Sequence, residues 1–174
     1  MASRQTTTLP SPDILKHDLF GRILRVAVPG GARIRRDLSG TPRGIGWLAR
    51  LLAANEARTL RRLGELVGLP QLLSWDGRHL DRSWIDGDCM ARARPTDPTY
   101  YRRAHALLRE VHRRGVAHND LAKEANWLVT PDGQPALVDF QLAWRAQPRN
   151  PWLRLLARDS GALSVIPEVV VRDE

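Results

Sequence analysis

The chain begins with apolar positions that alternate loosely with polar ones, and the pattern then changes to a helical period. Residues 14–28 alternate around a single glycine, and a turn at residues 29–31 leads into residues 32–37, which predicts strands on both sides of the turn. Four leucines then recur at helical spacing, so a helix is predicted from residue 44 or 45 to residue 66. A glycine and a proline just beyond are expected to end it.

A hairpin and a break are predicted after this helix. Residues 71–75 and 78–85 flank Asp76-Gly77, a dipeptide that favours a tight turn with positive φ. Residues 86–88 carry two aspartates around a glycine, and this sequence interrupts the apolar pattern. A linker is therefore predicted between two parts of the chain.

The second half is predicted to contain one long helix and another hairpin. The helix begins after Asp97, a candidate N-cap followed by a proline suited to the first helical position, and Gly115 ends its apolar stripe. Two short apolar runs at residues 127–129 and 136–140 flank a turn, and residues 142–174 are Arg-rich and then weakly apolar. This order of elements predicts an α+β fold.

The composition is that of a folded protein with a strong positive charge. Hydrophobic residues make up 43% and charged residues 26% of the 174 positions, which excludes a disordered chain. The 27 basic and 19 acidic residues leave a net charge of +8, which favours anionic partners. Only Lys16 and Lys123 are lysines, so the position of each is informative.

No segment is predicted to span a membrane or to export the chain. No apolar run approaches the ~18 residues of a membrane span. Residues 1–12 are polar and Thr-rich, without the order of charged and apolar regions found in a secretory signal. The single cysteine, Cys89, excludes an internal disulfide, so we expect a reducing, cytoplasmic compartment.

Polar side chains are expected to converge on the second hairpin. If the turn at residues 131–133 closes this hairpin symmetrically, Asn126 and Asp139 lie opposite each other, with Cβ atoms ~4.5–5.5 Å apart. Their amide and carboxylate oxygens are suited to share Mg²⁺. Asp120 and Lys123 lie in the loop that leads into the same hairpin. The alternative for Asp120 is a loop cap, and for Lys123 an exposed loop cation.

The motifs around these residues resemble those of the protein-kinase-like fold. His118-Asn119-Asp120-Leu121, followed by Asn126, is similar to the catalytic-loop motif H-x-D-L…N, and Asp139-Phe140-Gln141 is similar to D-F-G. In these motifs the chain is similar to bacterial RIO-like kinases and to the related lipopolysaccharide-kinase group. The resemblance covers about residues 14–145.

The resemblance implies a bilobal α+β protein that uses ATP and Mg²⁺. Residues 1–13 would be a flexible N-terminus, and residues 14–86 would form a sheet-rich N-lobe with one long helix. Residues 87–174 would form a reduced, truncated helical C-lobe that carries the catalytic-loop hairpin. We expect the nucleotide to lie between the two lobes.

The resemblance also implies a role for each polar residue of the loop and hairpin. Asp120 would orient the attacking hydroxyl or accept its proton, and Lys123 would neutralise the transferred phosphoryl group. Asn126 and Asp139 would hold the Mg²⁺ ion. His118 is expected to be a structural residue of the loop.

One carboxylate is predicted on the apolar face of the first helix. Glu56 lies four residues from a leucine on either side, so it needs a cationic partner. The resemblance implies a partner on the third strand, with Arg35 the first choice and Arg36 the second. A surface arginine is the alternative. Ile85-Asp86 would belong to the hinge against which adenine packs.

The chain departs from the kinase motifs at several points. Arginine replaces the third-strand lysine, glutamine replaces the glycine of D-F-G, and residues 16–22 carry one glycine in place of a glycine-rich loop. The step from Asp120 to Asn126 is one residue longer than in the kinase motif. The sequence after Asp139 is also short for a helical lobe with a substrate platform.

These observations predict an ATP-dependent kinase that phosphorylates serine or threonine on protein. A lipopolysaccharide-core sugar or a small molecule is the alternative acceptor, and a pseudokinase or truncated fragment that binds nucleotide without turnover is the alternative class. The basic run at residues 145–158 is expected to be a solvated helix face, with contact to the anionic inner face of a membrane as the second interpretation. A nucleic-acid partner is not expected, because only the net charge favours one.

Overall fold

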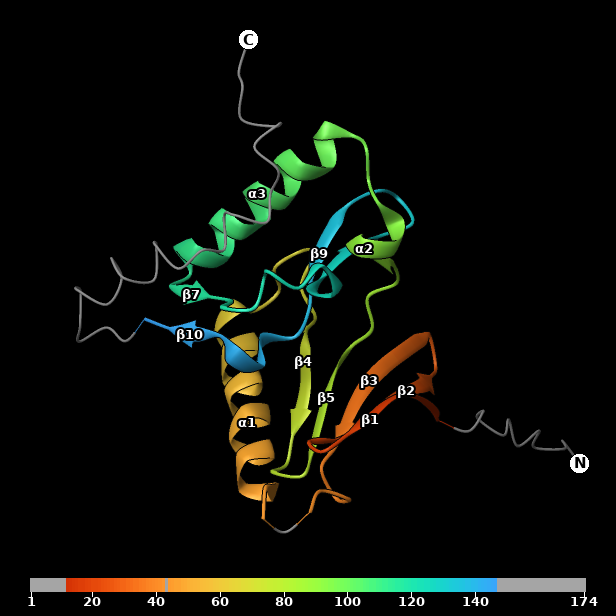
Figure 1. The fold of residues 1–174 in the computed structure, drawn as a ribbon, viewed down its shortest axis with the longest axis vertical. Helices are drawn as coiled ribbons and strands as arrows, with labels where there is room; N and C mark the ends of the chain where they lie inside the picture. Colours follow the sequence, from red (N-terminus) through yellow and green to blue (C-terminus); the bar gives the residue numbers. More distant parts are fainter. Residues whose placement is uncertain (1–11, 43, 147–174) are drawn as a thin grey trace, which may run out of the picture.

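The computed structural model describes residues 12–42 and 44–146, and a five-stranded antiparallel sheet occupies the first part of the chain (Figure 1). The order across the sheet is β1-β2-β3-β5-β4. Its strands are β1 (Asp13–Asp18), β2 (Gly21–Val28), β3 (Gly31–Asp37), β4 (Leu72–Trp75) and β5 (His79–Ser83).

Smaller sheets and helices follow. The strands β6-β8-β9 form one small sheet, and β7 and β10 form another. Their bounds are β6 (Asp88–Cys89), β7 (Val116–Ala117), β8 (Trp127–Val129), β9 (Pro135–Leu137) and β10 (Trp144–Arg145). The helices of this part are α2 (Met90–Ala93), α3 (Pro98–Arg113), and the 3-10 turns η1 (Glu124–Asn126) and η2 (Phe140–Leu142). The chain is therefore α+β, as predicted.

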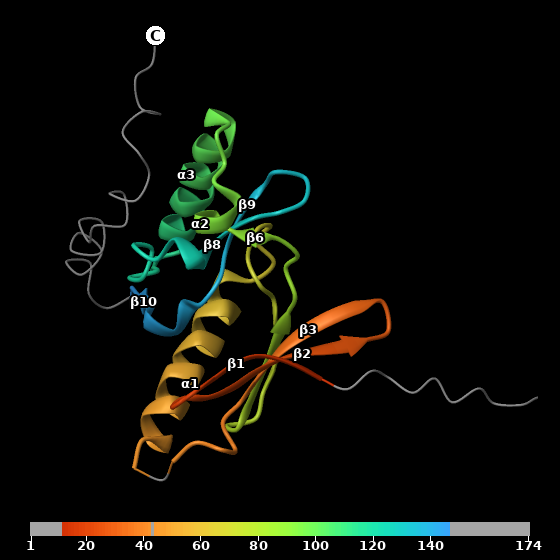
Figure 2. The ribbon, with the colours of Figure 1, turned by 45° about the vertical axis from the view of Figure 1, so that its right-hand side comes forward.

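Helix α1 (Gly46–Leu63) connects the two parts of the molecule (Figures 1 and 2). Three alanines of its buried face lie in one core cluster with Leu38 and Leu80, beside the sheet. Leu60 and Leu63, near its C-terminal end, belong instead to the larger core, which includes residues of α3, β8 and β9. A single rigid helix thus contributes to both cores, and its middle lies where they meet.

The sequence pattern predicted most of these elements correctly. The three strands before α1, the hairpin β4–β5 and the helix α3 are confirmed. Asp97 is the N-cap of α3, because its Oδ1 accepts a hydrogen bond from the backbone N–H of Thr99 at 2.8 Å. Gly115, beyond the end of α3, has a positive φ of 71°, a conformation that favours glycine.

Some boundaries differ from the prediction. Helix α1 ends at Leu63 rather than at residue 66, because Gly64 adopts a φ of 56° and turns the chain one glycine earlier than expected. The predicted linker at residues 86–88 is wrong at its last residue, because Asp88 begins β6 and pairs with Val129. The short helix α2 was not predicted, since four residues are too few to show a helical period.

Parts of the sequence-based predictions lie outside the described residues. These are most of the expected flexible start at residues 1–13 and nearly all of the basic run at residues 145–158. Across the residues that the structure does describe, no helix is both long enough and apolar enough to cross a bilayer.

Substitution of Gly21 tests the packing of the β1–β2 turn. Gly21 has a φ of 113°, and a Cβ built on it would lie 2.4 Å from the backbone oxygen of Asp37. Gly77 also has a positive φ, 90°, but a Cβ there meets nothing within 4 Å. We expect Gly21→Ala to lower the free energy of unfolding by about 3 kcal/mol and Gly77→Ala by about 1 kcal/mol, because only the first adds a backbone clash to the φ strain. Urea unfolding measures both, and equal losses would contradict this.

Candidate functional site

The loop after β7 is anchored by a buried histidine. The side chain of His118 is fully buried, its Nε2–H donates to the backbone oxygen of Val138 at 2.9 Å, and its ring lies 4.6 Å from that of Phe140. Burial lowers the pKa of His118, so the ring stays neutral near pH 7. These contacts are those of a structural residue, as the sequence predicted, and they hold the loop against the segment that carries Asp139.

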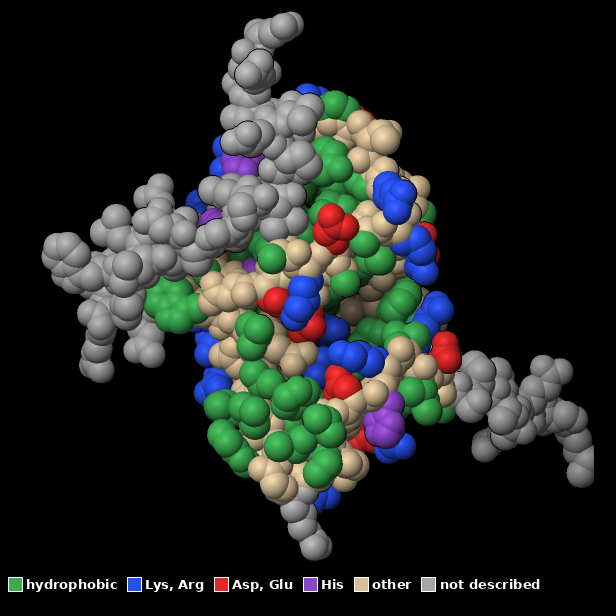
Figure 3. Space-filling view, viewed as in Figure 1, with side chains coloured by type: hydrophobic (Ala, Val, Ile, Leu, Met, Phe, Trp, Pro, Cys, Tyr) green, Lys and Arg blue, Asp and Glu red, His purple; other side chains and the backbone are tan. Residues whose placement is uncertain are grey.

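Asp120 is the centre of a polar group in this loop. Its Oδ2 accepts a hydrogen bond from Lys123 Nζ at 2.8 Å and another from Asn126 Nδ2 at 3.1 Å. Asn126 Nδ2 also donates to the backbone oxygen of Asp120 at 2.7 Å, which fixes the loop between the two residues. Figure 3 shows acidic and basic side chains gathered near the middle of the face it presents.

The electrostatics of this group keep Asp120 ionised. Partial burial by itself would raise the pKa of Asp120, but the hydrogen bonds from Lys123 and Asn126 outweigh burial and hold that pKa below its usual range. The hydrogen bond to Asp120 in turn raises the pKa of Lys123. The lysine side chain is 64% exposed, so this cation is available at the surface of the site.

Asp139 approaches the same group from the other end of the hairpin. It has a left-handed φ of 66°, and its Oδ1 accepts a hydrogen bond from Gln141 Nε2 at 2.7 Å. Its negative charge contributes to the pKa of both His118 and Lys123, which places the carboxylate within electrostatic range of the loop. Gln141, which stands where D-F-G has glycine, thus orients one oxygen of Asp139.

The predicted pairing of Asn126 with Asp139 is wrong by one residue. Trp127 is opposite Leu137, and the backbone N–H of Val138 donates to the backbone oxygen of Asn126 at 3.0 Å. The reason is the loop, in which Thr130 Oγ1 accepts from the backbone N–H of Gln134 and closes a five-residue connection instead of a symmetric turn. Asp139 therefore follows the residue opposite Asn126 and turns away from the strand direction.

The oxygens that remain suit an Mg²⁺ ion that takes further ligands from outside the protein, and they do not form a closed metal cage. Among residues 12–42 and 44–146, no cluster of three or more His, Cys, Asp or Glu side chains could hold a metal ion. Asn126 uses its NH₂ group toward Asp120, which leaves Oδ1 as a ligand, and Asp139 accepts the Gln141 bond on Oδ1 alone. Mg²⁺ is often bound by one or two carboxylates together with substrate phosphates, so this donor set is suitable.

Glu56 is fully buried in the middle of α1, and its partners are not those expected first. Its Oε1 pairs with Arg82 Nη1 of β5, and its Oε2 lies 4.0 Å from Arg36 Nε of β3. Arg35, the first choice, is wrong: it makes a two-pronged pair with Asp81, with both N···O distances 2.8 Å. Arg36, the second choice, is near the carboxylate, and the surface alternative is excluded.

The strand alternation explains this outcome. Side chains of β3 alternate between the two faces of the sheet, so Ile34 and Arg36 face α1 while Arg35 faces away. Arg82 is directly opposite Ile34 and therefore projects to the α1 side as well. A sequence search for a third-strand cation cannot find Arg82. The signal that could have found it is the alternation of β5, in which Arg82 follows the buried Leu80 by two residues and so shares its face.

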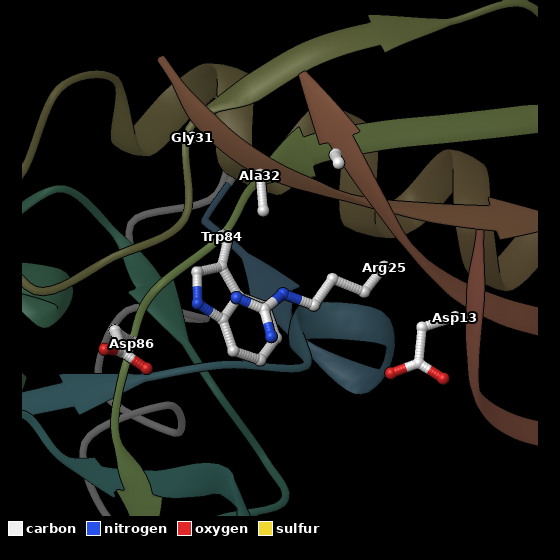
Figure 4. A pocket seen from close by; sticks show the side chains of 7 residues that line it. Asp13, Arg25, Gly31, Ala32, Trp84 and Asp86 are labelled. Atoms are coloured by element: carbon white, nitrogen blue, oxygen red, sulfur yellow. The ribbon is translucent and has the colours of Figure 1, made fainter. Parts of the chain in front are cut away.

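A pocket of about 470 Å³ lies on the same face of the sheet, beside Trp84 and Asp86 (Figure 4). Small side chains at Ala27 and Ala32, a cross-strand pair, leave the space. The guanidinium of Arg25 lies over the Trp84 ring, 4.6 Å from its centroid. Asp86, a predicted hinge residue, lines the pocket, whereas the neighbouring hinge residue, Ile85, is not among the lining residues. Arg25 and Trp84 were not predicted as site residues.

A polar link joins α1 to the segment after Asp139. Asn55 Nδ2 donates to the backbone oxygens of Gln141 at 2.9 Å and Ala143 at 2.8 Å. Arg145 Nη1 donates to Asn55 Oδ1 at 2.8 Å and to Thr59 Oγ1 at 2.7 Å. Asn55 and Glu56 are neighbours in α1. The part of the helix that places the buried Glu56 carboxylate therefore also holds the backbone that follows Asp139.

Comparison of the sequence with models of protein families found no match, and comparison with curated proteins found none either. A function is therefore inferred from the geometry of the site and from the motifs themselves.

A double-mutant cycle tests the assignment of the Glu56 partner. We expect Arg82→Leu and Glu56→Gln to be coupled by about 2 kcal/mol in the free energy of unfolding, because each change leaves the other charge buried with less compensation. The matched pair Arg35→Leu with Glu56→Gln should be additive to within about 0.5 kcal/mol, since Arg35 pairs with Asp81 on the opposite face. Urea unfolding of the single and double variants measures both cycles. Stronger coupling of Arg35 than of Arg82 would contradict the assignment.

Removal of Lys123 tests the electrostatics of the loop. In Lys123→Met, burial remains but one hydrogen bond is lost, so the pKa of Asp120 should rise toward 3.8, its ordinary value. In the wild type the folded-state pKa of Asp120 is below its ordinary value. The stability that Asp120 contributes is therefore fully present at pH values above 3.8, and it is lost as the pH falls through the lower, folded-state pKa. Carbon-13 NMR titration of the carboxylates measures the change. The matched variant Lys16→Met, which removes a 2.9 Å pair with Asp18, should leave Asp120 unchanged.

Proposed function

We propose that the protein is an ATP-dependent phosphotransferase with a bilobal kinase-like architecture, whose acceptor is a serine or threonine hydroxyl of a protein. The observation that carries this proposal is the hydrogen-bonded group of Asp120, Lys123 and Asn126, with Asp139 close to it. An ionised carboxylate, a cation and amide and carboxylate metal ligands are the parts that phosphoryl transfer requires.

The face of the sheet toward α1 supports a phosphate-binding role. Arg36 and Arg82 bring two positive charges to the single negative charge of Glu56, and Asp18 also lies within electrostatic range of Arg36. Arginine binds phosphate oxygens through a planar fork of donors, so it can substitute for lysine as the phosphate ligand, although the geometry differs. The pocket beside Trp84 lies on the same face and has room for a nucleobase.

In the proposed reaction the oxygen of the acceptor hydroxyl attacks the γ-phosphorus. The bond from that phosphorus to the bridging oxygen breaks, ADP leaves, and the hydroxyl proton passes to the carboxylate of Asp120. Lys123 offsets negative charge on the transferred group. Asn126 and Asp139 would hold Mg²⁺, which supplies charge neutralisation at the phosphates when it is bound.

One observation favours nucleotide binding without turnover as the second candidate. The Arg25 guanidinium covers a face of Trp84 that a base would use, so Arg25 must move when a base stacks there. If it does not move, a nucleotide binds with its base away from Trp84 and is not positioned for transfer. A core sugar at the inner face of a membrane is the alternative to a protein acceptor, and the molecule that carries the label distinguishes the two.

Radiolabelled ATP with Mg²⁺ tests the proposal on wild type, Asp120→Asn and Asp139→Asn. We expect transfer to protein to fall by about 10²-fold or more in both variants, because each loses a charge needed in the transition state. The control Asp132→Asn changes an exposed carboxylate in the hairpin loop and should keep full activity. A nucleotide-dependent thermal shift without transfer would favour the second candidate. The absence of both transfer and nucleotide binding would contradict the proposed function.

A further inference from the structure

The outer side of α1 exposes large apolar side chains. Trp47 is 64% exposed and Leu51, one turn later, is 52% exposed. Leu142 in η2, which packs beside α1, is 50% exposed. Figure 3 shows hydrophobic side chains gathered over α1 and next to it, in the lower part of the view. Grouped apolar exposure of this kind is typical of a binding surface rather than of chance.

The same side of the helix is basic and carries no acidic group. Arg50, Arg58 and Arg61 are exposed, and within residues 12–42 and 44–146 none of them forms an ion pair. Glu56, the one acidic residue of α1, is fully buried on the opposite side. We call Trp47, Arg50, Leu51, Arg58 and Arg61 the α1 outer face.

Arg58 of the α1 outer face lies within electrostatic range of another cation, Arg145 of β10. The pKa of Arg145 is lowered, first by burial and then by the nearby charges of Arg58 and Arg62. A bound anion would relieve this repulsion. Charge complementarity therefore favours a negative partner for the α1 outer face.

The residues form one stripe along the helix. Trp47, Leu51 and Arg58 follow at i, i+4 and i+11, so they lie on a single side. The apolar pair is near the N-terminal end, and Arg58 and Arg61 are nearer the C-terminal end. A helix that presents tryptophan, leucine and arginines along its length is suited to lie flat in a layer of lipid headgroups.

We propose that the α1 outer face docks on an anionic lipid bilayer. The tryptophan ring and Leu51 enter the boundary between headgroups and acyl chains, where tryptophan is favoured. The three arginines contact lipid phosphates. A nucleic acid would use the arginines without burying Leu51, so the combination of an exposed leucine with exposed arginines favours the bilayer. This proposal is independent of the proposed phosphotransfer.

Vesicle flotation of the full chain tests the proposal, with phosphatidylcholine alone against phosphatidylcholine mixed with phosphatidylglycerol. We expect binding to the anionic vesicles only, weakened by added salt because the ionic contribution is screened. The double variant Trp47→Ser, Leu51→Ser should lower the partition coefficient by about tenfold or more. Arg58→Gln and Arg61→Gln should each lower it about fivefold.

Matched variants separate this surface from a general effect of charge or hydrophobicity. Val67→Ser removes a 91% exposed apolar residue outside α1, and Arg109→Gln removes an exposed arginine of α3. Both should bind as wild type does, and circular dichroism melts check that every variant is folded. Equal loss in the controls, or unchanged binding in the variants of the α1 outer face, would overturn the proposal. Binding to RNA that depends on Arg58 but not on Trp47 would overturn it too.

Discussion

The burial of Glu56 is the constraint on which the arrangement of the molecule depends. A carboxylate with no exposed surface requires compensation by nearby positive charge, and the structure supplies it from two strands, through Arg82 of β5 and Arg36 of β3. The helix is therefore held at a rotation and height that bring this carboxylate to Arg82 and Arg36, and Oε2 accepts no hydrogen bond. Because α1 belongs to both cores, this fixed position also sets the relation between the five-stranded sheet and the elements that follow it.

The link through Asn55 extends that constraint to the other half of the candidate site. Its amide NH₂ group donates to the backbone of residues 141–143, just beyond Asp139, and its Oδ1 accepts a hydrogen bond from Arg145. The positions of the Glu56 carboxylate and of the Asp139 segment are thus tied to adjacent residues of one helix. Gln141 adds a side-chain bond to Asp139, so the segment has several fixed points and no glycine next to Phe140.

The sequence predicted those features that depend on local pattern and could not predict those that depend on register. Periodicity, the Asp97 cap and the turn glycines were sufficient for the strands and for α1 and α3, because each signal lies within a few neighbouring residues. The partner of Glu56 depends on which side of β3 each arginine faces and on what β5 places opposite, and Arg35 and Arg36 are equivalent until that alternation is known. The pairing of Asn126 failed for a similar reason, since one hydroxyl of Thr130 decides the length of the loop. The convergence of Asp120, Lys123 and Asn126 was predictable because all three lie in one short loop.

The arginines of this chain have different structural roles, which their count alone does not reveal. Arg35 pairs with Asp81 on the outer side of the sheet, where Arg33 shares the same carboxylate, and Arg82 pairs with Glu56 on the inner side. Arg36 shares Glu56 with Arg82 and also acts on the carboxylate of Asp18. The exposed arginines of α1 form no ion pair among the described residues, so their charge is directed to solvent and to whatever anion binds there. Among the described residues, the arginines therefore divide into those paired with a carboxylate, which help to fix the fold, and exposed ones of α1, which can act on a partner.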